Sequence, residues 1–251
     1  MIQDLFIITG TSRGLGLAMA EQLLSTRHVL LCISRHANAT LQDSAAEAGC
    51  ALTQWSQDLA NSVQTATALS TWLGDMSAAN WRTATLINNA GVIPLIAPLR
   101  DSDPEALVRA LRVGLEAPMA LTAAFLHATA AWPAQRKVLN ISSGLGRRAM
   151  ASQAAYCAAK AGMDHFTRCL ALDEASRPKG ALVCALAPGV IDTDMQIQLR
   201  SADPAAFPDQ ASFQQLKDAA NLSTPYDAAA RVLAYLAQKD FGSVPVADVR
   251  H

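Results

Sequence analysis

The hydrophobic residues of the chain are concentrated in short runs, separated by longer segments of mixed character. The runs lie at residues 5–8, 29–33, 51–55, 84–87, 137–141, 181–186 and 244–248. Short runs in which most residues are apolar are typical of parallel strands that helices cover on both faces. We therefore predict a seven-stranded parallel sheet.

The segments between these runs carry the spacing of helices. Apolar residues recur at helical intervals after the first run, at Leu15, Met19 and Leu23, and within a long segment from about 103 to 131, at Leu107, Leu111 and Leu115. Further helices are predicted at 154–176 and 225–238. Strands that alternate with helices predict a single doubly wound α/β domain over residues 1–251.

Composition narrows the class of protein. The chain is 51% hydrophobic and 16% charged, which excludes a disordered chain, and no apolar run approaches the ~20 residues of a membrane span. A net charge of -1 argues against nucleic acid as a partner. Five scattered cysteines without a C-x-x-C motif, and five histidines without a metal-type pair, predict neither disulfides nor a metal site. With no signal peptide at the N-terminus, we expect a cytoplasmic protein.

The first chemical motif is the glycine-rich turn Thr9-Gly10-Thr11-Ser12-Arg13-Gly14-Leu15-Gly16, which joins the first strand to a helix. Glycines let the backbone turn tightly and approach a ligand, and a helix N-terminus attracts an anion. The turn therefore predicts a phosphate-binding site, although by itself it is equally consistent with an ordinary glycine loop. A second motif, Asn88-Asn89-Ala90-Gly91, follows the fourth strand.

A catalytic constellation follows the fifth strand. Ser143 lies at its carboxyl end, Tyr156 is thirteen residues further on, and Lys160 is four residues beyond Tyr156 on the same helix face. Hydride transfer to a carbonyl carbon leaves an oxyanion that needs a proton donor within hydrogen-bond reach. We expect Tyr156 to be this donor, Lys160 to lower its pKa, and Ser143 to bind the substrate oxygen.

These motifs together resemble the short-chain dehydrogenase/reductase family over essentially the whole chain. The segments 141–144, 155–162 and 187–196 are similar to the branch that holds sepiapterin reductase and bacterial benzil reductase. The resemblance implies a Rossmann fold with its dinucleotide-binding part at about 1–140 and its catalytic and lid part at about 141–251. It implies that a nicotinamide cofactor contacts Gly10, Ser12, Arg13, Gly14, Leu15, Gly16, Ser34, Arg35, Asp58, Leu59, Asn89, Ala90, Gly91, Tyr156, Lys160, Pro188, Gly189, Val190 and Thr193.

The form of the cofactor follows from the end of the second strand. Relatives that bind NAD carry an acidic residue there for the ribose 2′-hydroxyl, whereas this chain has Ser34 followed by Arg35. Arg13 is expected within reach of the same corner, and two guanidinium groups suit a 2′-phosphate. We therefore expect NADP(H), although both arginines are also consistent with ordinary surface residues. Asp58 is interpreted as an adenine contact or as a helix N-cap.

One position departs from the family pattern, and a second has two possible interpretations. The family has an asparagine in the helix at 103–131, where a kinked backbone holds a water for proton relay, and this chain has Gly114. Glycine retains the carbonyl and can adopt the kink, so slower proton relay is our hypothesis. Asp248 corresponds either to the carboxylate that grips the pterin in sepiapterin reductase or to the residue that ends the last strand, which we favour.

The segment from Asp194 to Leu222 mixes apolar residues with prolines and predicts a small mobile lid. The expected substrate pocket consists of Ser143, Gly144, Leu145, Met150, Met195 and Leu199. We predict an NADPH-dependent reductase of a small aromatic or heterocyclic ketone or vicinal diketone. The alternatives are a 3-oxoacyl or pterin reductase, with Arg147, Arg148 and Arg200 as candidates for binding a carrier, and an NADP-binding regulatory protein with little turnover. A homodimer or homotetramer that uses the two long helices is expected.

Overall fold

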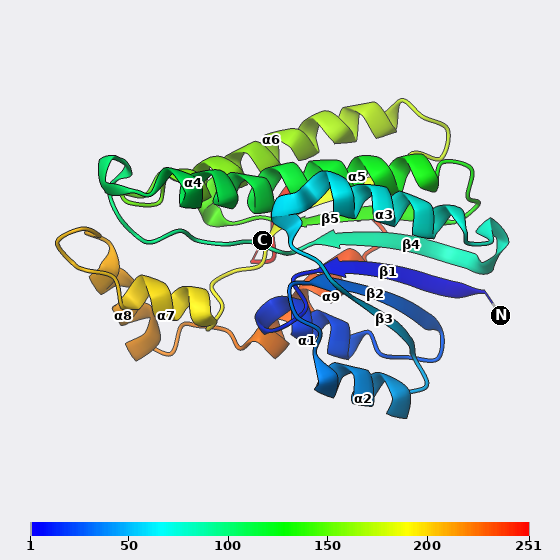
Figure 1. Ribbon diagram of the computed structural model, residues 1–251, viewed down its shortest axis with the longest axis horizontal. Helices are drawn as coiled ribbons and strands as arrows, with labels where there is room; N and C mark the ends of the chain where they lie inside the picture. The colour runs from blue at the N-terminus through cyan, green and yellow to red at the C-terminus, as the bar shows by residue number, and fades with distance from the viewer. Residues whose placement is uncertain (1, 251) are drawn as a thin grey trace.

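The computed structural model describes residues 2–250, and its strands form one parallel sheet (Figure 1). The strands are β1 (Gln3–Thr9), β2 (His28–Ser34), β3 (Ala51–Ser56), β4 (Trp81–Asn88), β5 (Gln135–Ile141), β6 (Leu182–Ala187) and β7 (Val246–Asp248). Their order across the sheet is β3-β2-β1-β4-β5-β6-β7. The predicted seven-stranded doubly wound sheet is confirmed.

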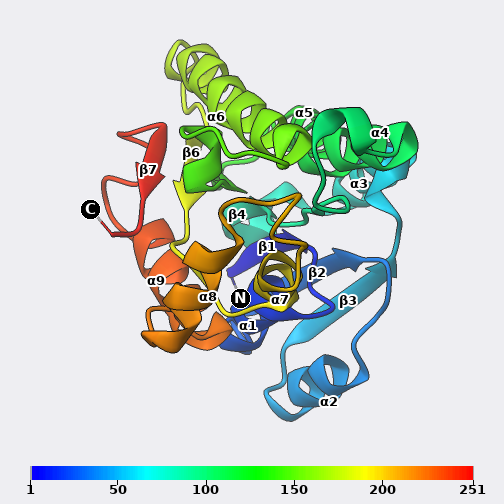
Figure 2. The same ribbon diagram turned by 90° about the vertical axis from the view of Figure 1, so that its left-hand side faces the viewer.

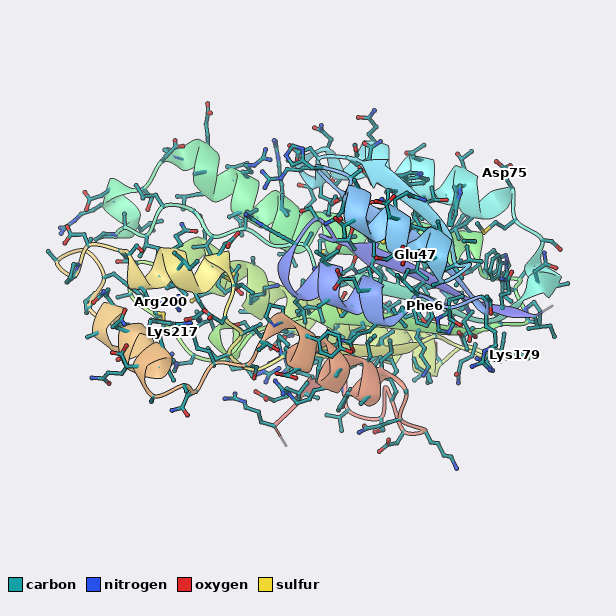
Figure 3. The ribbon with its side chains drawn as sticks, turned by 90° about the horizontal axis from the view of Figure 1, so that it is seen from below. Phe6, Glu47, Asp75, Lys179, Arg200 and Lys217 are labelled. Atoms are coloured by element: carbon teal, nitrogen blue, oxygen red, sulfur yellow. The ribbon has the colours of Figure 1, made fainter. Side chains whose placement is uncertain are left out.

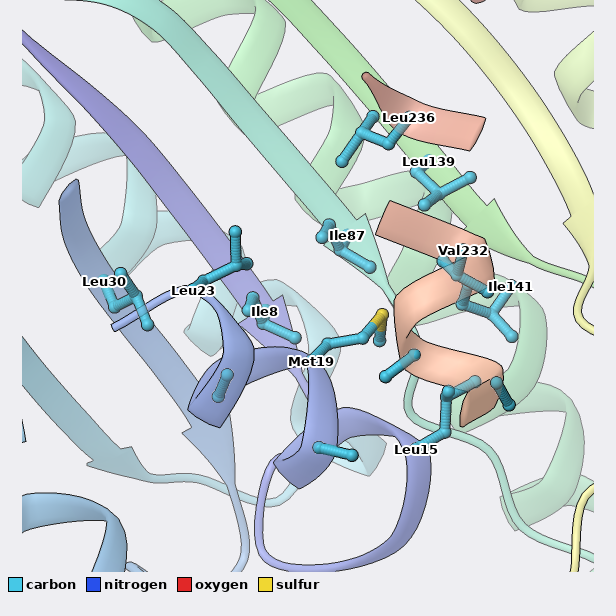
Figure 4. Close-up of a cluster of buried hydrophobic side chains, with 14 of the residues drawn as sticks. Ile8, Leu15, Met19, Leu23, Leu30, Ile87, Leu139, Ile141, Val232 and Leu236 are labelled. Atoms are coloured by element: carbon cyan, nitrogen blue, oxygen red, sulfur yellow. The ribbon is translucent and has the colours of Figure 1, made fainter. Parts of the chain in front are cut away.

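Helices cover both faces of the sheet (Figures 1 and 2). One face carries α1 (Gly14–Gln22), α2 (Ala39–Glu47) and α9 (Pro225–Leu236), and the other carries α3 (Ser62–Gly74), α4 (Pro104–Leu111), α5 (Ala117–Ala128) and α6 (Ala154–Ala175). Each face has its own apolar core. On the first face, Ile8, Met19 and Val232 are fully buried where α1 and α9 meet the sheet (Figure 4). Since helices cover both sides of the central strands, most residues of these strands are apolar and buried.

The helix predicted at 103–131 is interrupted. A π-helical turn at Arg112–Glu116 separates α4 from α5, and within it the Ala117 N–H donates to the carbonyl of Arg112. The physical cause is Pro118, which has no N–H to give to the carbonyl of Gly114 four residues earlier. The kink expected at Gly114 is therefore present.

The segment after β6 folds into two short helices, α7 (Asp194–Arg200) and α8 (Gln210–Asp218), with a core of its own. Phe207 is fully buried and its ring stacks on Phe213 at a centroid distance of 5.7 Å. Arg200 and Lys217 both bind Asp192, which ties the two helices to the loop after β6 (Figure 3). The segment predicted as a small mobile lid thus contains two helices with a packed core, and its mobility stays a prediction.

Candidate functional site

A cavity of about 780 Å³ opens at the carboxyl end of the sheet, where the strand order reverses between β1 and β4. Ligands of open α/β sheets bind at such a reversal. Every residue that the sequence predicted for the cofactor or for the substrate pocket lines this one cavity. The structure therefore brings the predicted site together, while the role of each residue in binding remains a prediction.

The glycine turn forms one end of the cavity. Gly10 and Gly14 have φ angles of 75° and 60°, in the left-handed region that glycine adopts without strain. A Cβ at Gly16 would lie 2.2 Å from the carbonyl oxygen of Gly10, so only glycine allows this packing. The N-terminus of α1 lines the cavity with Gly14, Leu15 and Gly16, as expected of an anion-binding turn.

The second motif fastens this turn to the next strand. The Nδ2 atom of Asn89 donates to the carbonyl of Thr9 at 2.9 Å, and the Thr9 hydroxyl accepts from the backbone N–H groups of Asn89 and Ala90. Asn88 reaches the other way and donates to Asn140 of β5 at 2.8 Å. The amides thus tie β1, β4 and β5 together.

Ser143, Tyr156 and Lys160 converge on one wall of the cavity. The Ser143 and Tyr156 hydroxyl groups share a hydrogen bond. The Nζ atom of Lys160 lies 5.7 Å from the centre of the Tyr156 ring and donates to the carbonyl of Ile141 at 2.7 Å. Since α6 presents the tyrosine and lysine on one face and β5 delivers the serine beside them, the expected constellation is formed.

The electrostatics of this wall are set mainly by burial. Burial raises the pKa of Tyr156 to about 12, and the hydrogen bond with Ser143 only partly opposes this effect. Burial also lowers the pKa of Lys160 to about 8, with the charge of Asp164 acting in the opposite direction. Burial thus dominates the pKa of Tyr156 in this structure, and the expected lowering of that pKa by Lys160 stays a prediction.

Both arginines expected near a 2′-phosphate line the cavity, Arg35 beside Ser34 and Arg13 in the glycine turn. Arg13 also forms an exposed ion pair with Asp194 at the start of the lid, with 2.5 Å between Nη1 and Oδ2. Asp58 caps the turn after β3 by accepting from the Ala60 N–H, which holds the pKa of its carboxyl below the usual range, and it also binds Arg109. The N-cap interpretation of Asp58 is confirmed.

Other expectations resolve into structural contacts. Asp248 ends β7 and binds Arg250 through both carboxylate oxygens, which confirms the structural interpretation of this residue. Of the three arginines considered for a carrier, Arg148 lines the cavity, whereas the other two bind Asp164 and Asp192. Cys157 packs against the lid core, and burial raises its pKa, as suits a packing residue better than a nucleophile.

Several cavity residues escaped the sequence analysis, among them Arg109, Gln196, Ser212 and Arg250. Arg109 approaches the site only because α4 lies beside Asp58, and no local pattern in the sequence gives that pairing. No helix within residues 2–250 has the length and hydropathy that a membrane crossing requires. Over the same residues, no cluster of His, Cys, Asp and Glu side chains could hold a metal ion.

Comparisons with known proteins agree with this geometry. The family model described as short chain dehydrogenase matches residues 4–204. The chain is 34% identical over 235 residues to benzil reductase ((S)-benzoin forming) of Bacillus cereus, and the match covers 94% of each protein. It is 32% identical to sepiapterin reductase of Xenopus tropicalis, covering 80% of this chain and 79% of that protein. The predicted likeness to both branch members is confirmed.

Solved structures share the fold over nearly the whole chain. A putative 2-deoxy-d-gluconate 3-dehydrogenase from Agrobacterium tumefaciens with bound NADP has a TM-score of 0.79 at 25% identity, with 99% of this chain and 95% of that chain covered. A 3-oxoacyl-[acyl-carrier protein] reductase from Brucella melitensis in complex with NAD has a TM-score of 0.81 at 23% identity, with 99% and 96% covered.

Proposed function

The chain belongs to the short-chain dehydrogenase family, and from this premise we propose that it is an NADPH-dependent carbonyl reductase of a small aromatic or heterocyclic ketone or vicinal diketone. The coarser statement, an oxidoreductase of this family, follows from the family match. The observation that carries the proposal is the convergence of Ser143, Tyr156 and Lys160 on a cavity whose other end is the glycine turn.

The residues of the cavity suit a nicotinamide dinucleotide. The glycine turn leaves no space for side chains at positions 10 and 16, and it presents the start of α1 to an anionic group. Lys160 and the segment 188–193 line the same cavity and would hold the nicotinamide half. When bound, the reduced cofactor supplies the hydride.

Side chains of this protein would then bind and protonate the substrate oxygen. Ser143 would donate a hydrogen bond to that oxygen and Tyr156 would give it a proton as negative charge develops there. Ser143 and Tyr156 line the same cavity and interact through their side chains, so both are placed to reach one substrate oxygen. Lys160, close to the tyrosine ring, stabilises the phenolate that this proton transfer leaves behind.

The preference for NADPH is supported by the residues at the end of β2. Ser34 offers no carboxylate to repel a 2′-phosphate, and Arg35 follows it at the rim of the same cavity. The fold does not decide this point, because the structural neighbours contain either NAD or NADP. Arg35 therefore carries most of the proposed preference, and Arg13, which lines the same cavity, is paired with Asp194 in this structure.

The substrate class is supported by the apolar lining of the substrate end and by the benzil reductase relative. Met150, Met195, Leu199, Phe213 and Leu216 line the cavity there, which favours an aromatic or other apolar group beside the carbonyl. A regulatory protein without turnover would not need Ser143, Tyr156 and Lys160 together on one cavity wall, so the reductase is the better-supported function.

The test follows NADPH oxidation with benzil, other diketones, sepiapterin and an acyl thioester. We expect turnover of a diketone and a fall of about 10²- to 10⁴-fold in Tyr156→Phe, the contribution of a general acid. Tyr226→Phe is the matched control, since this tyrosine is 62% exposed. Tight NADPH binding without turnover of any carbonyl in the panel would contradict the proposal.

A second arm tests the cofactor. Arg35→Ala should reduce the preference for NADPH over NADH by about 10- to 100-fold, the worth of one charge-assisted bond to a phosphate. Arg27 is an exposed arginine before β2, and Arg27→Ala should leave the preference for NADPH over NADH unchanged. Equal use of both cofactors by the unmodified protein would contradict the assignment.

We also propose a homodimer or homotetramer that uses the outer faces of α4, α5 and α6. Large apolar side chains are exposed there, including Val108, Met119 and Leu172, the last with 75% of its surface accessible. Light scattering should give at least twice the 26.5 kDa mass of one chain, and Leu172→Glu should weaken the association. A monomer at micromolar concentration would contradict this proposal.

A further inference from the structure

Asp164 is a buried carboxylate placed one helical turn beyond Lys160 in α6. Only 2% of its surface is exposed. Its Oδ1 atom accepts a hydrogen bond from the Ser142 hydroxyl, and its Oδ2 atom accepts from Nε of Arg147 at 3.0 Å. A buried carboxylate needs hydrogen bonds and an opposite charge to stay ionised, and Ser142 and Arg147 provide them for Asp164.

The partners of Asp164 are the sequence neighbours of the catalytic serine. Ser142 precedes Ser143, and Arg147 follows the short helical turn η5 (Gly144–Gly146) that Ser143 begins. Arg147 also donates to the carbonyl of Ala247 in β7 at 2.9 Å. One carboxylate on α6 therefore fixes both ends of the turn that carries Ser143.

The turn packs directly on the backbone of α6. A Cβ at Gly146 would lie 2.9 Å from the carbonyl oxygen of Lys160 and 3.1 Å from Oδ2 of Asp164. Glycine at 146 is thus what lets the serine turn and the catalytic helix meet at this point. The contact places the carboxylate, the lysine and the serine turn in one rigid unit.

The charge of Asp164 matters because Lys160 is itself 4% exposed. Within the described residues its ammonium donates to a backbone carbonyl, that of Ile141, and not to a carboxylate. Burial lowers the pKa of Lys160 to about 8, and Asp164 is the charged group that opposes this. Without a nearby negative charge, the ammonium would lose its proton within the working range of most enzymes.

Other titratable groups around this pair ionise at higher pH. Burial raises the pKa of Tyr156 on α6 to about 12, and it raises the pKa of Cys184 on β6 to about 11. Tyr235 on α9, which hydrogen-bonds Cys184, also has a pKa raised to about 12 by burial. Of these groups, Lys160 is therefore the one whose protonation changes near pH 8.

We propose that Asp164 is a positioning residue for carbonyl reduction: held by Ser142 and Arg147, it keeps the buried Lys160 protonated beside Tyr156 and fixes the turn of Ser143 onto α6. The consequence for catalysis rests on the proposed function, whereas the effect on the charge of Lys160 belongs to the chain alone. Asp164 touches neither the substrate position nor the phenol, and it acts through Lys160 and the serine turn.

The direct test measures the titration of Lys160 by carbon-13 NMR in protein with labelled lysines, with Lys160→Arg used for assignment. In Asp164→Asn the titration should move about one pH unit lower, since a charge one helical turn away in a buried setting has an effect of this size. Asp173→Asn, which removes an exposed carboxylate from the same helix, should leave it unchanged. An unchanged titration in folded Asp164→Asn overturns the proposal.

A pH profile separates this role from simple stabilisation. In Asp164→Asn the alkaline limb of kcat/KM should move down by the same one unit, which is up to a tenfold loss above the limb. Ser142→Ala breaks the same network without changing its charge, so it should lower the melting temperature and leave the limb in place. A limb that moves equally in both variants overturns the proposal.

A second variant keeps the test informative if Asp164→Asn does not fold. Arg147→Met combined with Asp164→Leu replaces the ion pair by apolar residues, an exchange that is often neutral for stability. This double variant should fold and should also lower the pKa of Lys160, whereas an unchanged pKa overturns the proposal. If wild type reduces no carbonyl but the pKa of Lys160 falls in these variants as expected, only the proposed function fails. If wild type reduces carbonyls but the pKa of Lys160 does not change in these variants, only the present inference fails.

Discussion

Replacing Gly16 with alanine should damage the cofactor end of the site, because the glycine turn has no space for a methyl group. A Cβ there would lie 2.2 Å from the carbonyl oxygen of Gly10 and 2.5 Å from Nδ2 of Asn89, so the turn must open by about 1 Å. Gly10 cannot retreat, since its own Cβ position is 2.9 Å from the Cα atom of Ala90. Overpacking against backbone costs about 3 kcal/mol, at the upper end of the usual range.

That cost corresponds to a fall of roughly 6–12 °C in melting temperature for a chain of this size, and to a weakening of NADPH binding of about 100-fold. Gly14→Ala should cost about 1–2 kcal/mol, because its φ is 60° while a Cβ there would make only an ordinary contact, 3.6 Å from Cγ2 of Thr193. Gly74→Ala, at the end of α3 with open space around it, should be neutral or stabilising by up to about 1 kcal/mol.

Urea unfolding gives the free energies, and a fluorescence titration with NADPH gives the affinities. The reasoning is refuted if Gly16→Ala unfolds with the free energy of wild type and binds NADPH as tightly. It is also refuted if Gly74→Ala is the most damaging of the three, because that order would separate the effect from the contacts on which it is based.

Three further substitutions test other parts of the structure. Gln153→Met should raise the free energy of unfolding in urea by about 1–2 kcal/mol, because both polar side-chain atoms of Gln153 lack a hydrogen-bond partner and the residue is 97% buried. A loss of stability would contradict this and indicate that the side chain has a partner. Burial raises the pKa of Asp4, but hydrogen bonds from Arg82 and Thr83 outweigh it and leave the pKa below its usual 3.8; the carboxylate therefore stabilises the fold above about pH 4 and less as the pH falls through its folded pKa. Asp4→Asn should cost about 1–2 kcal/mol at pH 7 and flatten the acid limb of the stability curve; an unchanged limb would contradict this. Gly114→Asn should lower kcat, because a Cβ there lies 3.1 Å from the Cβ of Ala159 beside Lys160, and a faster enzyme would contradict the packing argument.

The strands could be predicted because helices cover both faces of the sheet. Neither face of a strand is exposed to solvent, so the sequence shows a short, mostly hydrophobic run instead of alternating polar and apolar residues. The run Val29–Ile33 became β2 with one more residue at each end, and the other strands were found in the same way. Ser143, Tyr156 and Lys160 could be predicted because a strand end and a helix face fix where side chains point. These are local rules, and they hold without knowledge of the packing.

The remaining features depend on which side chains meet across the fold. Arg13, expected within reach of the 2′-phosphate corner, lines the cavity there, but its ion pair with Asp194 in the first turn of α7 had no local signal in the sequence. The pairing of Asp164 with Arg147 and the separate core of the lid likewise have no local pattern. The break in the helix at 103–131 did have a local signal, since a proline inside a helical pattern removes a backbone hydrogen bond, and the leucine spacing concealed it.

The break also explains why this chain can lack a side chain at position 114. Pro118 leaves the carbonyl of Gly114 without its helical donor whatever residue stands there, so the kink does not require an asparagine. At the same point α6 approaches so closely that a Cβ at 114 would press on Ala159. The glycine is thus the residue that lets the kinked helix pack against the helix of Tyr156 and Lys160. At the next residue of that helix, Gly146 does the same for the turn of Ser143, since a Cβ at 146 would lie 2.9 Å from the carbonyl oxygen of Lys160. Two glycines without side chains thus let the kinked helix and the serine turn both pack closely on α6 beside Lys160.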